Sequence, residues 1–154
     1  MRTGLFQVFL SLLLIAGLQT VVSAQATATF EIEAEILAIV NEYRSSKGLQ
    51  PFVSNDYVSK VAREHSSAMA RKATPYGHKG SNLRAKKIKQ EIVCGLVGEN
   101  AAVGQQNARE VVNAWIKSRG HRENILERQF TLTGIGVAKN KRGQLYFTQI
   151  FVSQ

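Results

Sequence analysis

The spacing of apolar residues constrains the fold of this 154-residue chain more than any other feature. In residues 30–47, 55–71 and 107–119, apolar side chains recur every three or four positions, the period of an amphipathic helix. Residues 132–152 instead carry β-branched and aromatic residues on both sides of the turn Asn140-Lys141-Arg142-Gly143, which is typical of a β-hairpin. The sequence therefore predicts an α+β fold with three main helices and a C-terminal hairpin.

Several local signals refine this prediction. Ser54 is a candidate N-cap for the second helix, and Asn107 with Glu110 resembles a capping box for the third. Gly120 suits the left-handed position that ends a helix. Trp115 is expected to anchor the core. Residues 83–89 are expected to form a short basic helix anchored by Leu83 and Ile88, and residues 92–97 a buried strand or an extended core segment.

The first 24 residues resemble an export signal. Arg2 is followed by an apolar stretch and then by the small residues Val22-Ser23-Ala24, where a signal peptidase would cut. A retained membrane anchor is the alternative, but polar residues interrupt a span that would need about 20 apolar ones. We expect a signal peptide at 1–24, a short leader at 25–32 and one domain at 33–154. The protein would then be secreted, or periplasmic in a Gram-negative source, with no transmembrane segment after cleavage.

Cys94 is the single cysteine, so no intramolecular disulfide can form. Exported small domains often use disulfides, and this one must rely on its core instead. Because Cys94 lies in an apolar run, we interpret it as a small hydrophobic residue and not as a nucleophile.

The formal net charge is +9, and removing Arg2 with the signal peptide would leave +8. Seven positive charges and no acid lie between residues 71 and 89, namely Arg71, Lys72, Lys79, Arg84, Lys86, Lys87 and Lys89. This segment could contact an anionic lipid surface or cell-wall polymer, or it could simply be a solvated face. Nucleic acid is not expected as a partner, because Tyr76 is the one aromatic residue interleaved with these charges.

Three residues are candidates for one polar pocket. Glu99 lies among small and apolar neighbours, so its charge needs a nearby partner. His121 follows Gly120, where the end of a helix would favour its protonated form. His78 lies in a glycine-containing loop that can approach from another side, although it could also be an exposed loop histidine, which the local sequence alone favours. A carboxylate near two imidazoles should raise their pKa values and lower its own unless burial dominates. His65 lies on the apolar helix face, either as a core histidine or as a pocket residue.

A series of motifs in this order resembles the CAP superfamily, also called SCP/PR-1-like, and most closely its disulfide-free bacterial-type extracellular members. The motifs are Ala62-x-x-His65-Ser66-x-x-Met69-Ala70, His78, Arg84, Gly98-Glu99-Asn100-Ala101-Ala102, Trp115-x-x-Ser118-x-Gly120-His121-Arg122-x-Asn124-Ile125-Leu126, Gly134-Ile135-Gly136-Val137 and Tyr146-Phe147-Thr148-Gln149-Ile150-Phe151. The resemblance covers about residues 33–151. It implies an α-β-α sandwich with a small antiparallel sheet between helices.

The resemblance also implies a cavity with two histidines and two glutamates. His78 and Glu99 match one of each, whereas Ser118 and Tyr146 stand where the second glutamate and second histidine belong. We expect His121 to fill the vacancy, with Ser118, Asn124 and Tyr146 at the edge of the cleft.

The chemistry of this set leaves two hypotheses open. His78, Glu99 and His121 could form a three-ligand zinc site for a hydrolase or protease, with Ser118 as a candidate nucleophile. The same residues could instead line the polar cavity of a non-enzymatic binding module, the hypothesis we favour. The resemblance implies small apolar ligands such as sterols or fatty acids for some members, and roles in contacts with extracellular protein partners.

Overall fold

The computed structural model describes residues 27–154, so the predicted signal peptide at 1–24 lies outside the described residues. Contacts within the chain define a compact unit from Ile32 to Gln154. The first helix is described over residues 27–46, and it therefore already includes residues 27–32, which the sequence analysis assigned to a leader. In the described part of the chain, no helix has the length and apolar character needed to cross a membrane.

A four-stranded sheet forms the centre of the compact unit, in the order β1-β3-β4-β2. Its strands are β1 (Val53–Ser54), β2 (Val97–Val103), β3 (Leu132–Lys139) and β4 (Leu145–Val152). The predicted hairpin is confirmed, since β3 and β4 pair antiparallel around the turn at residues 140–144. Strand β2 pairs antiparallel with β4 and lies at one edge, whereas the short β1 adds to β3 in parallel.

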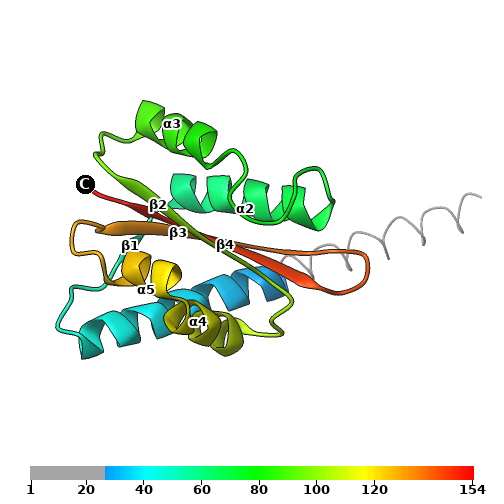
Figure 1. Ribbon diagram of the computed structural model, residues 1–154, viewed down its shortest axis with the longest axis horizontal. Helices are drawn as coiled ribbons and strands as arrows, with labels where there is room; N and C mark the ends of the chain where they lie inside the picture. The colour runs from blue at the N-terminus through cyan, green and yellow to red at the C-terminus, as the bar shows by residue number, and fades with distance from the viewer. Residues whose placement is uncertain (1–26) are drawn as a thin grey trace, which may run out of the picture. The chain divides into compact units, whose positions relative to one another are not determined.

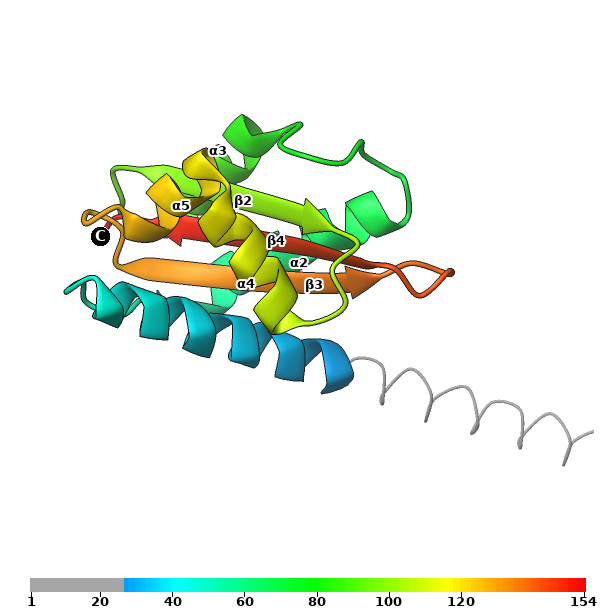
Figure 2. The same ribbon diagram turned by 60° about the horizontal axis from the view of Figure 1, so that its bottom comes forward.

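Helices cover both faces of the sheet (Figure 1, Figure 2). Helices α2 (Asp56–Ala70) and α3 (Ser81–Glu91) lie on one face. The other face is covered by residues 32–46 of the first helix together with α4 (Ala108–Lys117) and α5 (Arg119–Leu126). The predicted α+β class and α-β-α sandwich are thus confirmed.

Each face of the sheet has its own apolar core, because side chains alternate along β4. Phe147 and Phe151 join the larger cluster, which also holds Trp115 at 1% exposed. Ile150 and Val152 point the opposite way, into the smaller cluster under α2 and α3. Strand β4 therefore contributes side chains to both apolar cores.

Two glycines on β3 let α2 lie directly against the sheet. A Cβ atom at Gly134 would lie 2.2 Å from the backbone nitrogen of Ser59, and one at Gly136 2.2 Å from that of Arg63. The hydroxyl of Ser66 then donates to the Gly136 carbonyl oxygen at 2.8 Å. Only glycine permits this close approach. The approach also fixes the position of His65, which directly precedes Ser66 on α2.

The predicted strand at residues 92–97 is wrong, because only Val97 belongs to β2 and Val93 is 93% exposed. The strand instead runs through Gly98-Glu99-Asn100. Polar residues are tolerated here because Arg84 of α3 binds the Glu99 side chain on one face of the sheet and Asn124 of α5 binds the Asn100 side chain on the other. Leu83 is likewise not an anchor of α3, since it is 68% exposed while Ile88 is fully buried.

The prediction that Gly120 ends a helix is also wrong. Helix α4 ends at Lys117, Ser118 is extended with φ −79° and ψ 125°, and α5 starts at Arg119. Gly120 lies in the first turn of α5 and is absent from the glycines with positive φ. His121 is therefore close to the N-terminus of a helix, where the dipole disfavours protonation. At α2 the N-cap is Asn55, one residue after the predicted Ser54.

Candidate functional site

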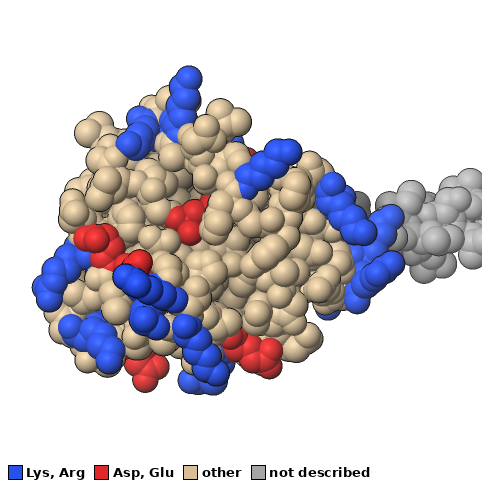
Figure 3. All heavy atoms as spheres, in the orientation of Figure 1, with Lys and Arg blue, Asp and Glu red and all other residues tan. Residues whose placement is uncertain are grey.

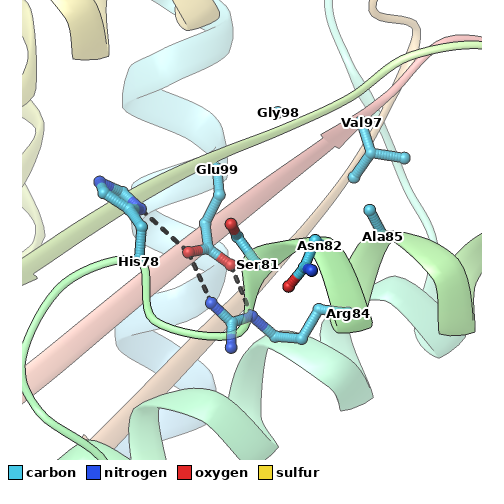
Figure 4. Close-up of a pocket in the computed structure, with 8 residues that line it drawn as sticks. All are labelled: His78, Ser81, Asn82, Arg84, Ala85, Val97, Gly98 and Glu99. Carbon is cyan, nitrogen blue, oxygen red and sulfur yellow. Dashed lines mark hydrogen bonds and ion pairs between the residues drawn. The ribbon is translucent and has the colours of Figure 1, made fainter.

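Glu99 is the centre of the candidate site, and three hydrogen bonds hold its carboxylate. Arg84 of α3 donates from Nε to Oε2 at 2.7 Å and from Nη2 to Oε1 at 2.8 Å. Nδ1 of His78 lies 3.0 Å from Oε1 (Figure 4). The Glu99 side chain is only 7% exposed, so these bonds replace the water that the carboxylate loses.

The surroundings keep Glu99 ionised. Burial alone would raise the pKa of Glu99, but the hydrogen bonds from Arg84 and then His78 outweigh it and hold the pKa below its ordinary 4.5. The prediction that Glu99 lowers its own pKa through a nearby partner therefore agrees with the structure. The main partner is Arg84, which the sequence analysis listed in the basic segment and among the family motifs but did not assign to the pocket.

His65 lies beneath the site and supports the loop that carries His78. Its side chain is 2% exposed, and its Nε2 is 2.8 Å from the Gly77 carbonyl oxygen, to which it donates. The same nitrogen is 3.9 Å from Oε1 of Glu99. Burial lowers the pKa of His65, so the ring is neutral at neutral pH. His65 thus fits both interpretations, as a core histidine that also contacts the site.

His121 approaches from the opposite side of the edge strand. Its ring centroid lies 6.2 Å from that of His78, so the two imidazoles share one end of the site. Burial, and secondarily the charge of His78, lowers the pKa of His121. The expectation that its protonated form would be favoured is therefore wrong, because burial dominates and the supposed helix C-terminus is an N-terminus.

Two asparagines fasten α5 to the free edge of β2. Nδ2 of Asn124 donates to the Glu99 carbonyl oxygen at 3.2 Å and to Oδ1 of Asn100 at 2.9 Å. Nδ2 of Asn100 in turn donates to the His121 carbonyl oxygen at 3.0 Å. Asn124 thus holds the backbone of β2 in place at Glu99. Asn100, fully buried, is part of the same support, although sequence reasoning did not select it.

Ser118 and Tyr146 do not join this group. Ser118 forms the junction between α4 and α5, where its carbonyl oxygen accepts from the Arg122 amide at 2.9 Å. The Tyr146 hydroxyl donates to Oε1 of Gln144 at 3.3 Å and lines a different pocket near the β3–β4 hairpin. The structure therefore brings together His65, His78, Glu99, His121 and Asn124, with Arg84 as the residue that reasoning missed. The sequence did contain a signal for a residue such as Arg84, because a buried Glu99 needs a cation as its partner.

A pocket of about 310 Å³ opens beside Glu99. Its wall combines polar and small residues from three segments: His78, Ser81, Asn82, Arg84, Ala85, Val97, Gly98 and Glu99. Because the His78 side chain is 50% exposed, its ring can meet a molecule that enters. The site can therefore offer hydrogen-bonding groups at a fixed position.

The residues present do not fit the three-ligand zinc site that we considered. Arg84 bonds to both oxygens of Glu99, and its fixed positive charge would repel a second cation there. Among residues 27–154, no group of three or more His, Cys, Asp and Glu side chains is placed to hold a metal ion.

The fold and site define an α-β-α sandwich with a histidine- and glutamate-containing pocket at a sheet edge. The model of the Cysteine-rich secretory protein family, CAP, matches residues 37–151, and the chain belongs to this family. The resemblance noted in the sequence is thereby confirmed.

Two similar proteins come from Bacillus species. The uncharacterised protein YkwD of Bacillus subtilis (strain 168) is 33% identical over 128 residues, which are 79% of this chain and 47% of YkwD. An SCP-domain extracellular protein from Bacillus anthracis is similar in structure, with a TM-score of 0.75, 25% identity, and coverage of 84% of this chain and 43% of that one.

A third similar protein shows only that the fold is shared. An outer surface protein of Borrelia burgdorferi has a TM-score of 0.71 at 24% identity, with 80% of this chain and 93% of that chain covered. The chain thus spans about half the length of YkwD and of the Bacillus anthracis protein, so the similarity concerns the CAP domain.

Proposed function

We propose that this CAP domain acts outside the cell as a non-enzymatic binding module, and that its ligand enters the pocket beside Glu99. The observation that carries the proposal is that both oxygens of the Glu99 carboxylate are already hydrogen-bonded, by Arg84 and His78. A carboxylate bonded in this way is better suited to orienting its neighbours than to taking up a proton. The expected export signal and the similarity to an extracellular SCP-domain protein of Bacillus anthracis support the location.

The alternative hydrolase is less well supported by this arrangement. A general base needs a pKa near the working pH and access to the proton that it removes. Glu99 has a lowered pKa, and both of its oxygens are already bonded. Ser118, the candidate nucleophile, is not among the residues that line the pocket, so the structure does not support that role.

The lining favours a small polar ligand. Pockets for apolar ligands are lined mainly by hydrophobic and aromatic side chains. This one presents Ser81, Asn82 and the half-exposed ring of His78, with Ala85 and Val97 as its apolar contribution. We therefore expect the ligand to hydrogen-bond to the imidazole and amide groups, and we favour such a molecule over a sterol or fatty acid.

A screen of polar fragments, followed by amide NMR of the isotope-labelled protein, tests the proposal. Hits should shift the amide resonances of residues 78–85 and 97–99. The variant Ala85→Leu places bulk in the pocket from α3 and should abolish these shifts. Its matched control is Lys86→Leu, which changes the adjacent exposed position of the same helix outside the pocket. Hits that map elsewhere, or that survive Ala85→Leu unchanged in a folded protein, would refute the proposal.

A further inference from the structure

A second pocket, of about 600 Å³, lies between the end of α2 and the β3–β4 hairpin. Its lining includes five cationic residues and no acidic one, and the cations are Arg71, Lys72, Lys139, Lys141 and Arg142. They come from segments about 70 residues apart in the sequence, so the fold alone brings them together. In Figure 3 basic side chains gather at this end of the molecule, where the hairpin turn lies in Figure 1.

The charges in this pocket are not neutralised by neighbours. Within residues 27–154, no carboxylate forms an ion pair with any of the five cations. All five side chains belong to exposed residues. Like charges around one pocket repel one another and raise the local positive potential, which attracts anions.

The basic segment predicted at residues 71–89 does not act as one surface. Arg84 points to Glu99, and Lys87 pairs with Glu64 at 2.7 Å. Of the seven cations, only Arg71 and Lys72 reach the second pocket. The segment therefore contributes two charges to a site whose other three come from the hairpin.

Hydrogen bonds fix the backbone of the hairpin turn that carries Lys141 and Arg142. Oδ1 of Asn140 accepts the backbone amides of Arg142 at 2.9 Å and Gln144 at 3.0 Å, which closes the turn. On the other wall, Nη1 of Arg71 donates to the Ser67 hydroxyl at 2.8 Å, so its guanidinium is oriented. A pocket built this way loses less conformational entropy when it binds a ligand.

We infer that this second pocket is a binding site for phosphate groups, suited to a ligand that carries more than one negative charge. Arginine presents a planar fork that matches phosphate oxygens, and lysine adds compact point charges around it. The phosphates could belong to a free phosphate chain or to lipid headgroups, since both present the same oxygens. The inference does not depend on the Glu99 pocket.

Isothermal titration of the exported protein with sodium tripolyphosphate tests the site directly. Binding should be measurable at about 50 mM salt and should weaken steeply at about 200 mM, because screening shortens the reach of the charges. The double variant Lys141→Gln, Arg142→Gln should lower the affinity at least about tenfold, as expected for the loss of one or more charge-assisted hydrogen bonds. Cosedimentation with phosphatidylglycerol vesicles, run in parallel, distinguishes lipid phosphates from free ones.

The matched control is Lys86→Gln, Lys89→Gln, which removes the same charge from exposed positions of α3. It should change the affinity less than about twofold, as usual for surface charges away from a site. A loss confined to the hairpin variant supports the site. Equal losses in both variants would reduce the effect to net charge and overturn the inference, and so would the absence of binding to both tripolyphosphate and vesicles at the lower salt concentration.

Discussion

The guanidinium of Arg84 bonds to both carboxylate oxygens of Glu99, at 2.7 and 2.8 Å, across the gap between α3 and the edge strand β2. The Arg84 side chain is 15% exposed and that of Glu99 is 7% exposed. This ion pair ties a helix to the sheet and neutralises the buried carboxylate of Glu99.

Removing Arg84 should destabilise the fold. Arg84→Met leaves the buried Glu99 charge without its main partner, which should cost roughly 3–5 kcal/mol of unfolding free energy. Urea denaturation at neutral pH measures the loss. Lys87→Met is the control, because the Lys87–Glu64 pair has the same 2.7 Å distance but is about half exposed and should contribute about 0–1 kcal/mol. Equal costs for the two variants would contradict the structural role of Arg84.

A glycine-to-alanine substitution should destabilise the protein at Gly134 of β3 and stabilise it at Gly120 of α5. Gly134→Ala drives a Cβ into the α2 backbone at 2.2 Å, so we expect a loss of about 3 kcal/mol or more. Gly120→Ala meets nothing within 4 Å and lies in a helix, so it should stabilise by up to about 1 kcal/mol. Thermal melts of both variants check this, and a neutral Gly134→Ala would contradict the packing of α2.

Trp115→Ala should cost roughly 3–5 kcal/mol, because the side chain is 1% exposed within the larger core cluster. The control is Val93→Ala at 93% exposed, which should stay within about 0.5 kcal/mol. A loss below about 1 kcal/mol for Trp115→Ala would place this residue outside the core.

Stability should fall when the pH drops below about 6.5. His65 and His121 have folded-state pKa values below 6.5, so the unfolded chain takes up protons first as the pH falls. The stabilisation is therefore complete above 6.5 and is lost towards the folded-state pKa. Glu99, whose folded-state pKa is below 4.5, adds a second loss under that pH. Urea midpoints at pH 7.5, 5.5 and 4 measure both effects.

The variant His121→Gln should show a smaller drop in midpoint between pH 7.5 and 5.5 than the wild type, since one of the two groups is gone. A wild-type midpoint that stays constant over this range would show that burial does not perturb either histidine.

The parts of the fold with regular apolar periods could be predicted from the sequence. The hairpin, the core position of Trp115 and the Asn107–Glu110 cap follow from local patterns that tertiary contacts reinforce. The strand β2 could not be predicted locally, because Glu99 and Asn100 are stabilised there by Arg84 and Asn124, which lie elsewhere in the sequence.

The candidate site, too, could be predicted only in part from the sequence. Apolar neighbours correctly indicated a buried Glu99, and the resemblance supplied His78. Local sequence could not show that Ser118 separates two helices, and that separation reversed the electrostatic environment expected for His121. Nor could it show that Tyr146 faces the hairpin pocket, because strand register decides which end of β4 lies beside Glu99.

The most direct test of the central claim is the NMR signal of the His78 and His121 imidazole protons, recorded in the wild type and in Glu99→Gln with and without one equivalent of zinc chloride. We predict that Glu99→Gln shifts the His78 resonances, because Nδ1 lies 3.0 Å from the carboxylate, and that zinc leaves both rings unchanged. Imidazole signals that have the same chemical shifts in the wild type and in Glu99→Gln would show that the shared pocket does not exist. Stoichiometric zinc shifts of both rings that disappear in Glu99→Gln would instead establish a metal site and contradict the binding-module account.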